Sequence, residues 1–341
     1  MISAKYSGDK KIFVGQAIST PPGPGEVQIK VAFVGLCGTD LHILHGAMDA
    51  RVKIPLIFGH EMSGEIAMLG PQVQEWQVGD KVTVMPLDWD NTCPACLAGN
   101  KHICQNLNFV GIDSPGALQG LWNVNSSWLL ALPADISLKD AALIEPVAVA
   151  VHDVRRAELK SGEKIIILGG GPIGILIATV AREFGAEILL AEIDQNRRRM
   201  VEEIGFKTID PTDEGFLETI NEWTNGAGAD AVFEVSGAAS AVLQATDIAK
   251  VRGRIVIVAI HPTPRNVNLH RIFMRELTIV GVRVYERIDF ELAIEYVSLG
   301  KIPCSQLISK VVPISEISDA VATLEAGQAM KILIDVGGAA K

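Results

Sequence analysis

The chain has 341 residues, of which 48% are hydrophobic and 21% are charged, and its net charge at neutral pH is −10. This balance is typical of a globular protein of about two domains and excludes a disordered chain. The acidic total argues against nucleic acid as a partner, because phosphate contacts need many lysines and arginines.

No segment predicts insertion into a membrane or export. The longest uncharged run, Ile165–Ala181, is interrupted by glycines and is shorter than the roughly 20 apolar residues of a spanning helix. Residues 1–5 carry no apolar signal core. The 5 cysteines are an odd number, which argues against a disulfide framework. We therefore expect a cytoplasmic protein with no membrane partner.

The first third of the chain alternates with a period of two residues. Val27, Ile29 and Val31 share one side of a predicted strand that follows a turn rich in proline and glycine. Val82 and Val84 repeat the pattern after a second turn. Strands broken at short intervals by such turns predict a β-rich or barrel-like domain.

The middle of the chain alternates between short apolar strands and helices of about ten residues, a pattern typical of βαβ units and a parallel sheet. The predicted strands are Lys164–Leu168, Ile188–Glu192, Ala231–Glu234, Arg254–Val258 and Thr278–Val280, and two predicted helices are Ile173–Phe184 and Asn196–Ile204.

Mixed patterns return after Tyr285, with a helix at Phe290–Leu299 and strands at Gln306–Val312 and Lys331–Val336. The predicted fold class is therefore α/β, with a Rossmann-type doubly wound parallel sheet inserted into a β-rich domain. Residues 1–147 and 286–341 are assigned to the β-rich domain, and residues 148–285 to the dinucleotide-binding domain.

A glycine-rich turn indicates a dinucleotide site. Gly169, Gly171 and Gly174 fit the pattern G-x-G-x-x-G, with Pro172 and Ile173 between them. Such glycines also occur in turns that serve only packing, but here the turn follows a strand and opens a helix. The turn lets a pyrophosphate approach the backbone, and the helix N-terminus offers unpaired N–H groups.

An acid at the end of the second strand of this domain predicts the choice of cofactor. Glu192 is placed to accept hydrogen bonds from the adenosine ribose hydroxyls and to repel a 2′-phosphate, which favours NAD. Arg197, a few residues later, is the competing signal, because an arginine there can contact a phosphate. We expect Glu192 to dominate.

Two groups of residues suggest metal sites. Cys37, His60 and Glu61 offer the mixed sulfur, nitrogen and oxygen ligands that Zn²⁺ takes in catalytic sites. Glu145 lies in an apolar stretch, where a metal would satisfy its charge, and the alternative is an acid at a helix N-terminus. A second group lies within twelve residues and consists of Cys93, Cys96 and Cys104.

The ordered motifs Cys-Gly-Thr-Asp-x-His, Gly-His-Glu, the cysteine group, Glu-Pro and the glycine turn resemble those of the zinc-dependent medium-chain alcohol dehydrogenases. The run Glu145–His152 is most similar to the polyol (sorbitol and butanediol) branch. The resemblance implies a GroES-like catalytic domain and a catalytic zinc held by Cys37, His60 and Glu61. Glu145 would be a fourth ligand or a partner of the zinc water, and Thr39 and His42 would relay the proton.

The sequence departs from this family at two places. Asp90 stands where the first of four structural zinc cysteines is expected, so the implied second site is Asp90, Cys93, Cys96 and Cys104, with a lobe that has lost its metal as the alternative. Arg283 is offset by one residue from the arginine that holds a distal hydroxyl in sorbitol-type enzymes. On a strand this offset would turn the side chain to the opposite face.

We therefore expect an NAD- and zinc-dependent oxidoreductase that converts a small secondary alcohol, a polyol or a sugar-derived one, to a ketone. The same chemistry on L-threonine or a sugar acid is an alternative, and a non-catalytic dinucleotide-binding protein is an alternative of another class. The resemblance also implies a homo-oligomer, a dimer or homotetramer, paired through the sheet edge of the cofactor domain.

Overall fold

The computed structural model describes residues 1–337 and divides into two compact units. Unit 1 is formed by Met1–Pro146 and Glu286–Lys341, and unit 2 by Val147–Tyr285. The division predicted after residue 147 therefore lies one residue late. Residues 338–341, which the sequence assigned to the β-rich domain, lie outside the described residues. The expected fold class, a dinucleotide-binding fold inserted into a β-rich domain, is confirmed.

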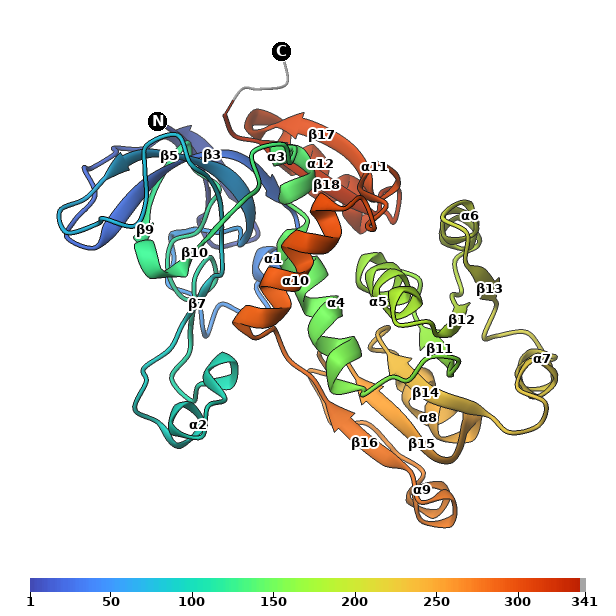
Figure 1. The fold of residues 1–341 in the computed structure, drawn as a ribbon. Coiled ribbons are helices and arrows are strands. Elements are labelled where there is room, and N and C mark those ends of the chain that lie inside the picture. The colour runs from blue at the N-terminus through green and yellow to red at the C-terminus, as the bar shows by residue number, and fades with distance from the viewer. Residues whose placement is uncertain (338–341) are drawn as a thin grey trace. The chain divides into compact units, whose positions relative to one another are not determined.

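Unit 1 is built on a seven-stranded sheet with the order β10-β6-β5-β3-β18-β17, in which β9 also pairs with β3 (Figure 1). A three-stranded sheet, β2-β1-β4, and the pair β7-β8 complete it. Its strands are β1 (Ile2–Tyr6), β2 (Ile12–Gln16), β3 (Glu26–Gly35), β4 (Leu56–Ile57), β5 (Glu61–Leu69), β6 (Lys81–Val84), β7 (Leu87–Asp88), β8 (Asn108–Phe109), β9 (Leu121–Asn125), β10 (Leu129–Ala131), β17 (Ile308–Pro313) and β18 (Lys331–Asp335).

The helices of unit 1 are short, apart from α10, and they connect or cover these strands. They are α1 (Gly38–Leu44), α2 (Pro94–Leu97), α3 (Leu138–Ala141), α10 (Arg287–Ser298), α11 (Cys304–Leu307) and α12 (Ile317–Glu325). Helix α4 (Ile144–Arg156) begins in unit 1 and continues into unit 2.

Strand β3 lies in the middle of the main sheet of unit 1, and every second residue of its first half is buried in the core. Val27, Ile29 and Val31 are completely buried, as their spacing predicts. The same strand pairs antiparallel with β5, β9 and β18, and in the last pair Leu333 lies opposite Gly35. A strand from the C-terminal part of the chain thus lies beside one from the N-terminal part.

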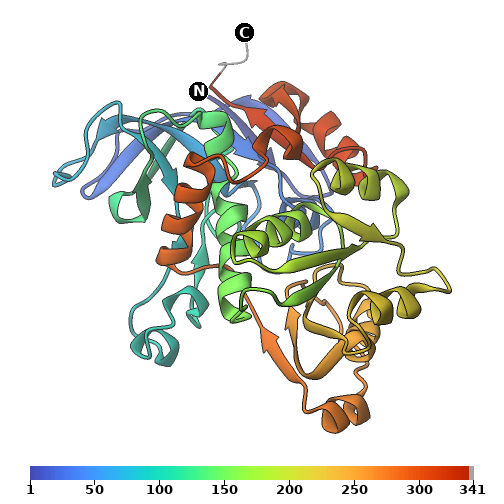
Figure 2. The same ribbon diagram turned by 45° about the vertical axis from the view of Figure 1, so that its right-hand side comes forward.

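Unit 2 contains a six-stranded parallel sheet with the order β13-β12-β11-β14-β15-β16 (Figures 1 and 2). The strands are β11 (Lys164–Leu168), β12 (Glu187–Ala191), β13 (Lys207–Ile209), β14 (Ala229–Glu234), β15 (Ala249–Ile257) and β16 (Thr278–Gly281). The helices are α5 (Pro172–Glu183), α6 (Gln195–Glu203), α7 (Phe216–Trp223), α8 (Ala239–Ile248) and α9 (Leu269–Arg275).

The central strands β11 and β14 contain the buried apolar runs Ile165–Leu168 and Ala231–Phe233, as expected of strands covered by helices on both faces of a sheet. Ile166 and Val232 pack with residues of α7 and α8 in one core cluster, while Ile165 and Ile167 are completely buried although they belong to no part of that cluster. Strand β16 ends at Gly281, so Arg283 follows the strand and is exposed. The argument that placed Arg283 on a strand is therefore wrong.

No helix among residues 1–337 is both long enough and apolar enough to span a bilayer.

Candidate functional site

The first group of predicted metal ligands meets in unit 1. Cys37 is the residue before α1, and His60 and Glu61 stand where β5 begins. One ligand atom from each of the three lies within 4.8 Å of the others. His60 and Glu61 are 3% and 1% exposed, so their polar atoms depend on partners inside the protein. We call these three residues the Cys37 cluster.

His60 has a carboxylate beside it that makes no hydrogen bond to it. His60 Nδ1 lies 3.7 Å from Asp40 Oδ1, and both buried atoms lack a hydrogen-bond partner among the described residues. Burial lowers the pKa of His60, but Asp40 and the Cys37 side chain outweigh it and raise the pKa to about 10.

The donor set of the cluster fits Zn²⁺, which accepts thiolate, imidazole and carboxylate ligands. A histidine that binds zinc orients its second ring nitrogen toward a carboxylate, as Asp40 is placed to allow. Asp40 is itself anchored on α1, where its Oδ2 accepts a hydrogen bond of 2.9 Å from the backbone N–H of Cys37.

Glu61 has a partner that the sequence analysis missed. Lys331 Nζ, at the start of β18, lies 2.8 and 2.6 Å from the two carboxylate oxygens of Glu61 and donates to the backbone oxygen of Leu36. Lys331 is 4% exposed. The signal is a lysine directly before the apolar run Ile332–Ile334, since lysine is almost never fully buried without a partner. Gly35 leaves the space for Glu61, because a Cβ there would clash with the carboxylate.

Glu145 lies close to this cluster. It is the second residue of α4 and is 4% exposed. The alternative expectation, an acid at a helix N-terminus, therefore gives its position correctly. Its negative charge contributes to raising the pKa of both His60 and Lys331. Glu145 therefore acts electrostatically on the same group of residues.

The two residues of the implied proton relay lie on α1. Thr39 is partly buried and His42 is exposed in the last turn of the helix. Residues three apart on a helix share a face, so the partly buried Thr39 and the exposed His42 lie on one face of α1.

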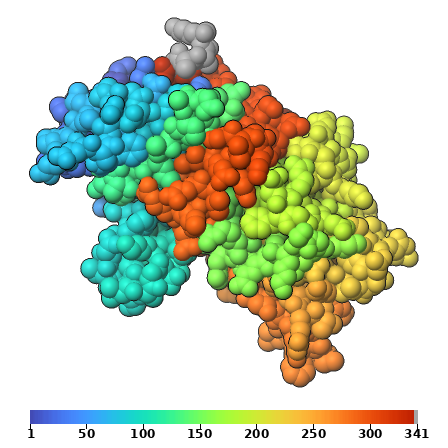
Figure 3. Space-filling view, in the orientation of Figure 1, coloured from blue at the N-terminus to red at the C-terminus, as the bar shows by residue number. Residues whose placement is uncertain are grey.

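The cysteine lobe, residues 89–107, extends between β7 and β8, and its side chains stand out at the lower left of Figure 3. Ligand atoms of Asp90, Cys93, Cys96 and Cys104 lie within 4.8 Å of one another. The three cysteines are buried and form the centre of a small cluster of their own. Asp88 and His102 also lie close by in the sequence, but neither belongs to this group of ligand atoms.

Asp90 also organises the loop around the cysteines. Its Oδ1 accepts hydrogen bonds of 2.8 and 2.9 Å from the backbone N–H groups of Thr92 and Cys93, and its Oδ2 accepts one of 2.6 Å from Asn106. These bonds hold the pKa of Asp90 well below its usual range. The carboxylate is therefore kept ionised beside the three thiols.

In unit 2 the glycine turn joins β11 to α5, as its pattern predicts. Gly169 has φ +121°, which favours glycine, and a Cβ on Gly174 would clash with the carbonyl oxygen of Gly169. Gly171 precedes α5, and Pro172 and Ile173 are its first residues. The unpaired N–H groups of this helix start suit a phosphate.

Glu192 follows β12 and reaches back to the turn. Its Oε2 accepts a hydrogen bond of 2.8 Å from Gly170 N, and its Oε1 accepts one of 2.9 Å from Asp194 N. Glu192 is 5% exposed, whereas the side chain of Arg197, 3.9 Å from it, is 38% exposed. The carboxylate of Glu192 is thus fixed beside the glycine turn, whereas the guanidinium of Arg197 is more exposed to solvent.

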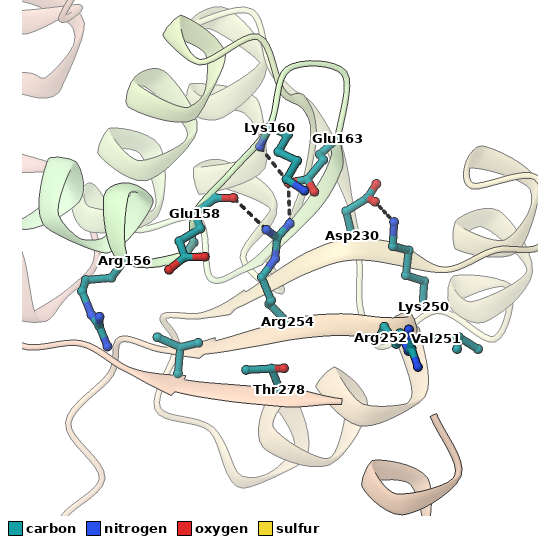
Figure 4. Close-up of a pocket in the computed structure, with 12 residues that line it drawn as sticks. Arg156, Glu158, Lys160, Glu163, Asp230, Lys250, Val251, Arg252, Arg254 and Thr278 are labelled. Carbon is teal, nitrogen blue, oxygen red and sulfur yellow. Dashed lines mark hydrogen bonds and ion pairs between the residues drawn. The ribbon is translucent and has the colours of Figure 1, made fainter. Parts of the chain in front are cut away.

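A cavity of about 520 Å³ lies elsewhere in unit 2, at the amino ends of the parallel strands (Figure 4). Thr278, the first residue of β16, lines it together with charged side chains. Arg254 pairs with Glu163, and Lys250 with Asp230. None of the residues predicted to bind cofactor lines this cavity, because they follow the carboxyl ends of the strands.

Comparisons with known proteins identify the family. Residues 23–134 match the alcohol dehydrogenase GroES-like domain family, and residues 172–298 match the zinc-binding dehydrogenase family. The chain is 48% identical to 2-dehydro-3-deoxy-L-galactonate 5-dehydrogenase of Pseudoalteromonas atlantica, over 98% of both chains. It is 31% identical to sorbitol dehydrogenase of Halalkalibacterium halodurans, over 92% of both.

A solved structure shows the same fold. The zinc-binding dehydrogenase of Sinorhizobium meliloti, bound to NADP, matches with a TM-score of 0.93 and 30% identity over 98% of each chain.

Proposed function

The chain belongs to the zinc-binding alcohol dehydrogenase family, and on this premise we propose that it oxidises a secondary hydroxyl of a sugar acid with NAD. The observation that carries the proposal is the convergence of the Cys37, His60 and Glu61 ligand atoms within 4.8 Å. Glu145 completes the proposed catalytic zinc site, as a fourth ligand or as a partner of bound water.

The choice of a sugar acid rests on the relative from Pseudoalteromonas atlantica, whose name gives such a substrate and which is 48% identical. A polyol is the second candidate, because the sorbitol dehydrogenase relative is 31% identical.

The experiment is a screen of NAD reduction by the zinc-loaded enzyme on 2-dehydro-3-deoxy-L-galactonate, sorbitol, butanediol and L-threonine. We expect the highest kcat/KM with the sugar acid. A clear preference for sorbitol would favour the polyol instead, and no turnover of any alcohol would contradict the proposal.

In this proposal zinc supplies Lewis-acid chemistry, which lowers the pKa of an alcohol so that it ionises near neutral pH. The carboxylate of Asp40 lies 3.7 Å from His60 Nδ1, where it would favour a proton on that nitrogen and leave Nε2 for the metal, and Lys331 balances the charge of Glu61. When bound, NAD would supply a hydride acceptor for the alcohol carbon. Thr39 would accept the alcohol proton as it passes its own hydroxyl proton to His42, which would release a proton to solvent.

We assign the preference for NAD to Glu192. The Glu192→Ala variant is expected to lower the ratio of kcat/KM for NAD to that for NADP by about tenfold, because a fixed negative charge near a 2′-phosphate disappears. Initial rates with both cofactors measure this ratio. The matched control is Glu187→Ala, because Glu187 is an exposed acid at the start of β12. A wild-type preference for NADP would show that Arg197 dominates.

We further propose that Asp90, Cys93, Cys96 and Cys104 hold a structural zinc. The Asp90→Ala variant is expected to lower the zinc content from about two ions per chain to about one, and to lower stability before activity. Elemental analysis of the purified protein measures the content.

Asp90→Asn tests metal binding with the backbone contacts of Asp90 kept, because an amide oxygen still accepts from the N–H groups of Thr92 and Cys93. Only the hydrogen bond from Asn106 to Oδ2 is lost. The zinc content of Asp90→Asn should fall nearly as far as that of Asp90→Ala. The Asp88→Ala control should keep both ions. Wild-type protein with one zinc and freely alkylated Cys93 and Cys96 would contradict this assignment.

The proposed assembly is a homo-oligomer, a dimer or tetramer, that forms through β16 and α9. Strand β16 is the last in its sheet and its Ile279 is 46% exposed. Leu269, Phe273 and Met274 on α9 are 71%, 79% and 62% exposed, and this segment projects at the bottom of Figure 3. Light scattering should give a multiple of the chain mass that Phe273→Glu reduces, and a monomeric wild type would contradict the assembly.

A further inference from the structure

The cavity at the amino ends of the parallel strands of unit 2 takes no part in the proposed reaction. All of its lining residues belong to unit 2. Glu163 lines it directly before β11, whereas the glycine turn follows the other end of that strand. The five residues of β11 put about 16 Å between these two places. With about 520 Å³, the cavity has the size of a small-molecule site and is separate from the dinucleotide turn.

The charge of this cavity is opposite to that of the whole chain. Five arginines and lysines line it against three acids, although the chain carries a net charge of −10. Two positive charges of the lining are therefore not balanced within it. A concave surface with an excess of one charge raises the local concentration of ions of the other sign. The cavity thus favours an anion.

Two of the five cations are held by acids of the same lining. Arg254, on β15, pairs with Glu163 and donates a hydrogen bond of 2.8 Å to the backbone oxygen of Glu158, as the dashed lines in Figure 4 show. Lys250 pairs with Asp230. These pairs neutralise two acids, so Glu158 alone among the lining acids opposes the other three cations.

Those three cations are not bound inside the cavity. Arg156 and Lys160 form no side-chain hydrogen bond or ion pair with any of residues 1–337. Arg252 pairs with Glu276, which does not line the cavity, and both side chains are more than half exposed. An exposed pair of this kind contributes little, so Arg252 can turn to a ligand. Figure 4 shows Arg156 on one side of Arg254 and Arg252 on the other.

A bulge in β15 brings part of this charge to the cavity. Ala249 lies opposite Ala229 of β14, and Arg254 lies opposite Ala231, so two steps along β14 correspond to five along β15. Residues 250–253 therefore bulge out of the sheet, and they include two of the lining cations. Bulges re-aim side chains and are common beside functional sites.

The backbone is strained at two residues that line the cavity. Glu158 and Arg252 have φ +52° and +57°, in the left-handed region that favours glycine. Such conformations persist only where the surrounding structure holds them, and they cluster at ligand sites. A glycine would adopt either conformation more easily but would bring no charged side chain to the cavity.

From the size, charge and backbone of this cavity, we propose that it binds a small polyanion, a molecule with two or more phosphate or carboxylate groups. Arg156, Lys160 and Arg252 hold it, because guanidinium and ammonium groups bind the oxygens of both kinds of group. Their positions on either side of Arg254 suit an extended molecule with an anionic group at each end. This site is additional to the proposed reaction and does not depend on which alcohol is oxidised.

The test is isothermal titration of the zinc-loaded enzyme, saturated with NADH, with fructose 1,6-bisphosphate and with tricarballylate. NADH occupies the phosphate-binding turn, so the probes report on a different site. We expect the bisphosphate to bind, and the double variant Arg156→Gln with Lys160→Gln to raise its Kd at least about tenfold, because two charged contacts are lost. Both side chains are exposed, so the variant should fold and keep its KM for NAD.

The matched control is the double variant Arg199→Gln with Lys207→Gln. It removes the same charge from exposed positions of unit 2 that do not line the cavity, and its Kd should stay at the wild-type value. Binding of the bisphosphate alone would identify a phosphate ligand, and equal binding of tricarballylate would extend the site to carboxylates. Absence of binding by both probes at millimolar concentration, or an equal loss in the two double variants, would overturn the proposal.

Discussion

The Cys37→Ala variant is expected to lose at least about 10³-fold in kcat, because zinc polarisation of the alcohol contributes several kcal/mol to the barrier. It should bind NADH with nearly wild-type affinity, since the glycine turn and Glu192 belong to unit 2 and Cys37 to unit 1. Steady-state rates, NADH fluorescence titration and zinc analysis together measure the three expectations.

Cys304→Ala is the control for loss of a thiol. Cys304 is also buried in unit 1, in α11, but belongs to no group of metal ligands among the described residues. Its removal should leave kcat and zinc content unchanged. Turnover by carefully metal-stripped wild type, or by Cys37→Ala, would contradict the zinc mechanism.

The Lys331→Met variant is expected to lose about 3–5 kcal/mol of stability when metal-free, the usual cost of leaving one partner of a buried ion pair uncompensated. Lys331 and Glu61 are 4% and 1% exposed, so water cannot replace the missing charge. Urea denaturation of metal-stripped protein measures the loss. With zinc bound, the cost should be smaller, because the cation would balance Glu61 in place of the lysine.

Two further variants check this interpretation. Lys331→Met combined with Glu61→Gln should recover much of the lost stability, since it removes the orphaned charge. Lys310→Met, on the neighbouring strand β17 at an exposed position, should cost little. A metal-free Lys331→Met protein as stable as metal-free wild type would show that Glu61 is neutralised in another way.

Much of the fold follows from residue periodicity. The strand Lys164–Leu168 agrees with the predicted bounds at both ends, because an apolar run between a charged loop and a glycine turn leaves little choice. Helix α5 begins one residue before the predicted Ile173, since proline is well suited to the first helical position. Arg283 was misplaced because β16 ends at Gly281, and edge strands have little sequence signal for where pairing stops.

The candidate site was predictable where its residues lie in short motifs. The three-residue steps between Asp90, Cys93 and Cys96 place their ligand atoms in one loop, and Cys104 joins them. The contact between Glu61 and Lys331 joins residues 270 positions apart, and a single sequence contains no pattern that links them. The same holds for the contact between His261 and Glu234, 27 positions apart. Such pairs are determined by the sheet topology.

The pairing of β18 with β3 determines the order in which the two units can mature during translation. Unit 2 is a continuous segment, so a ribosome releases all of it well before β18. Domains generally fold as units and in order of synthesis. Nascent unit 1, in contrast, holds Cys37, His60 and Glu61 without the strand that carries Lys331 until synthesis is almost finished. Newly made protein therefore completes unit 2 before Glu61 gains its buried cationic partner.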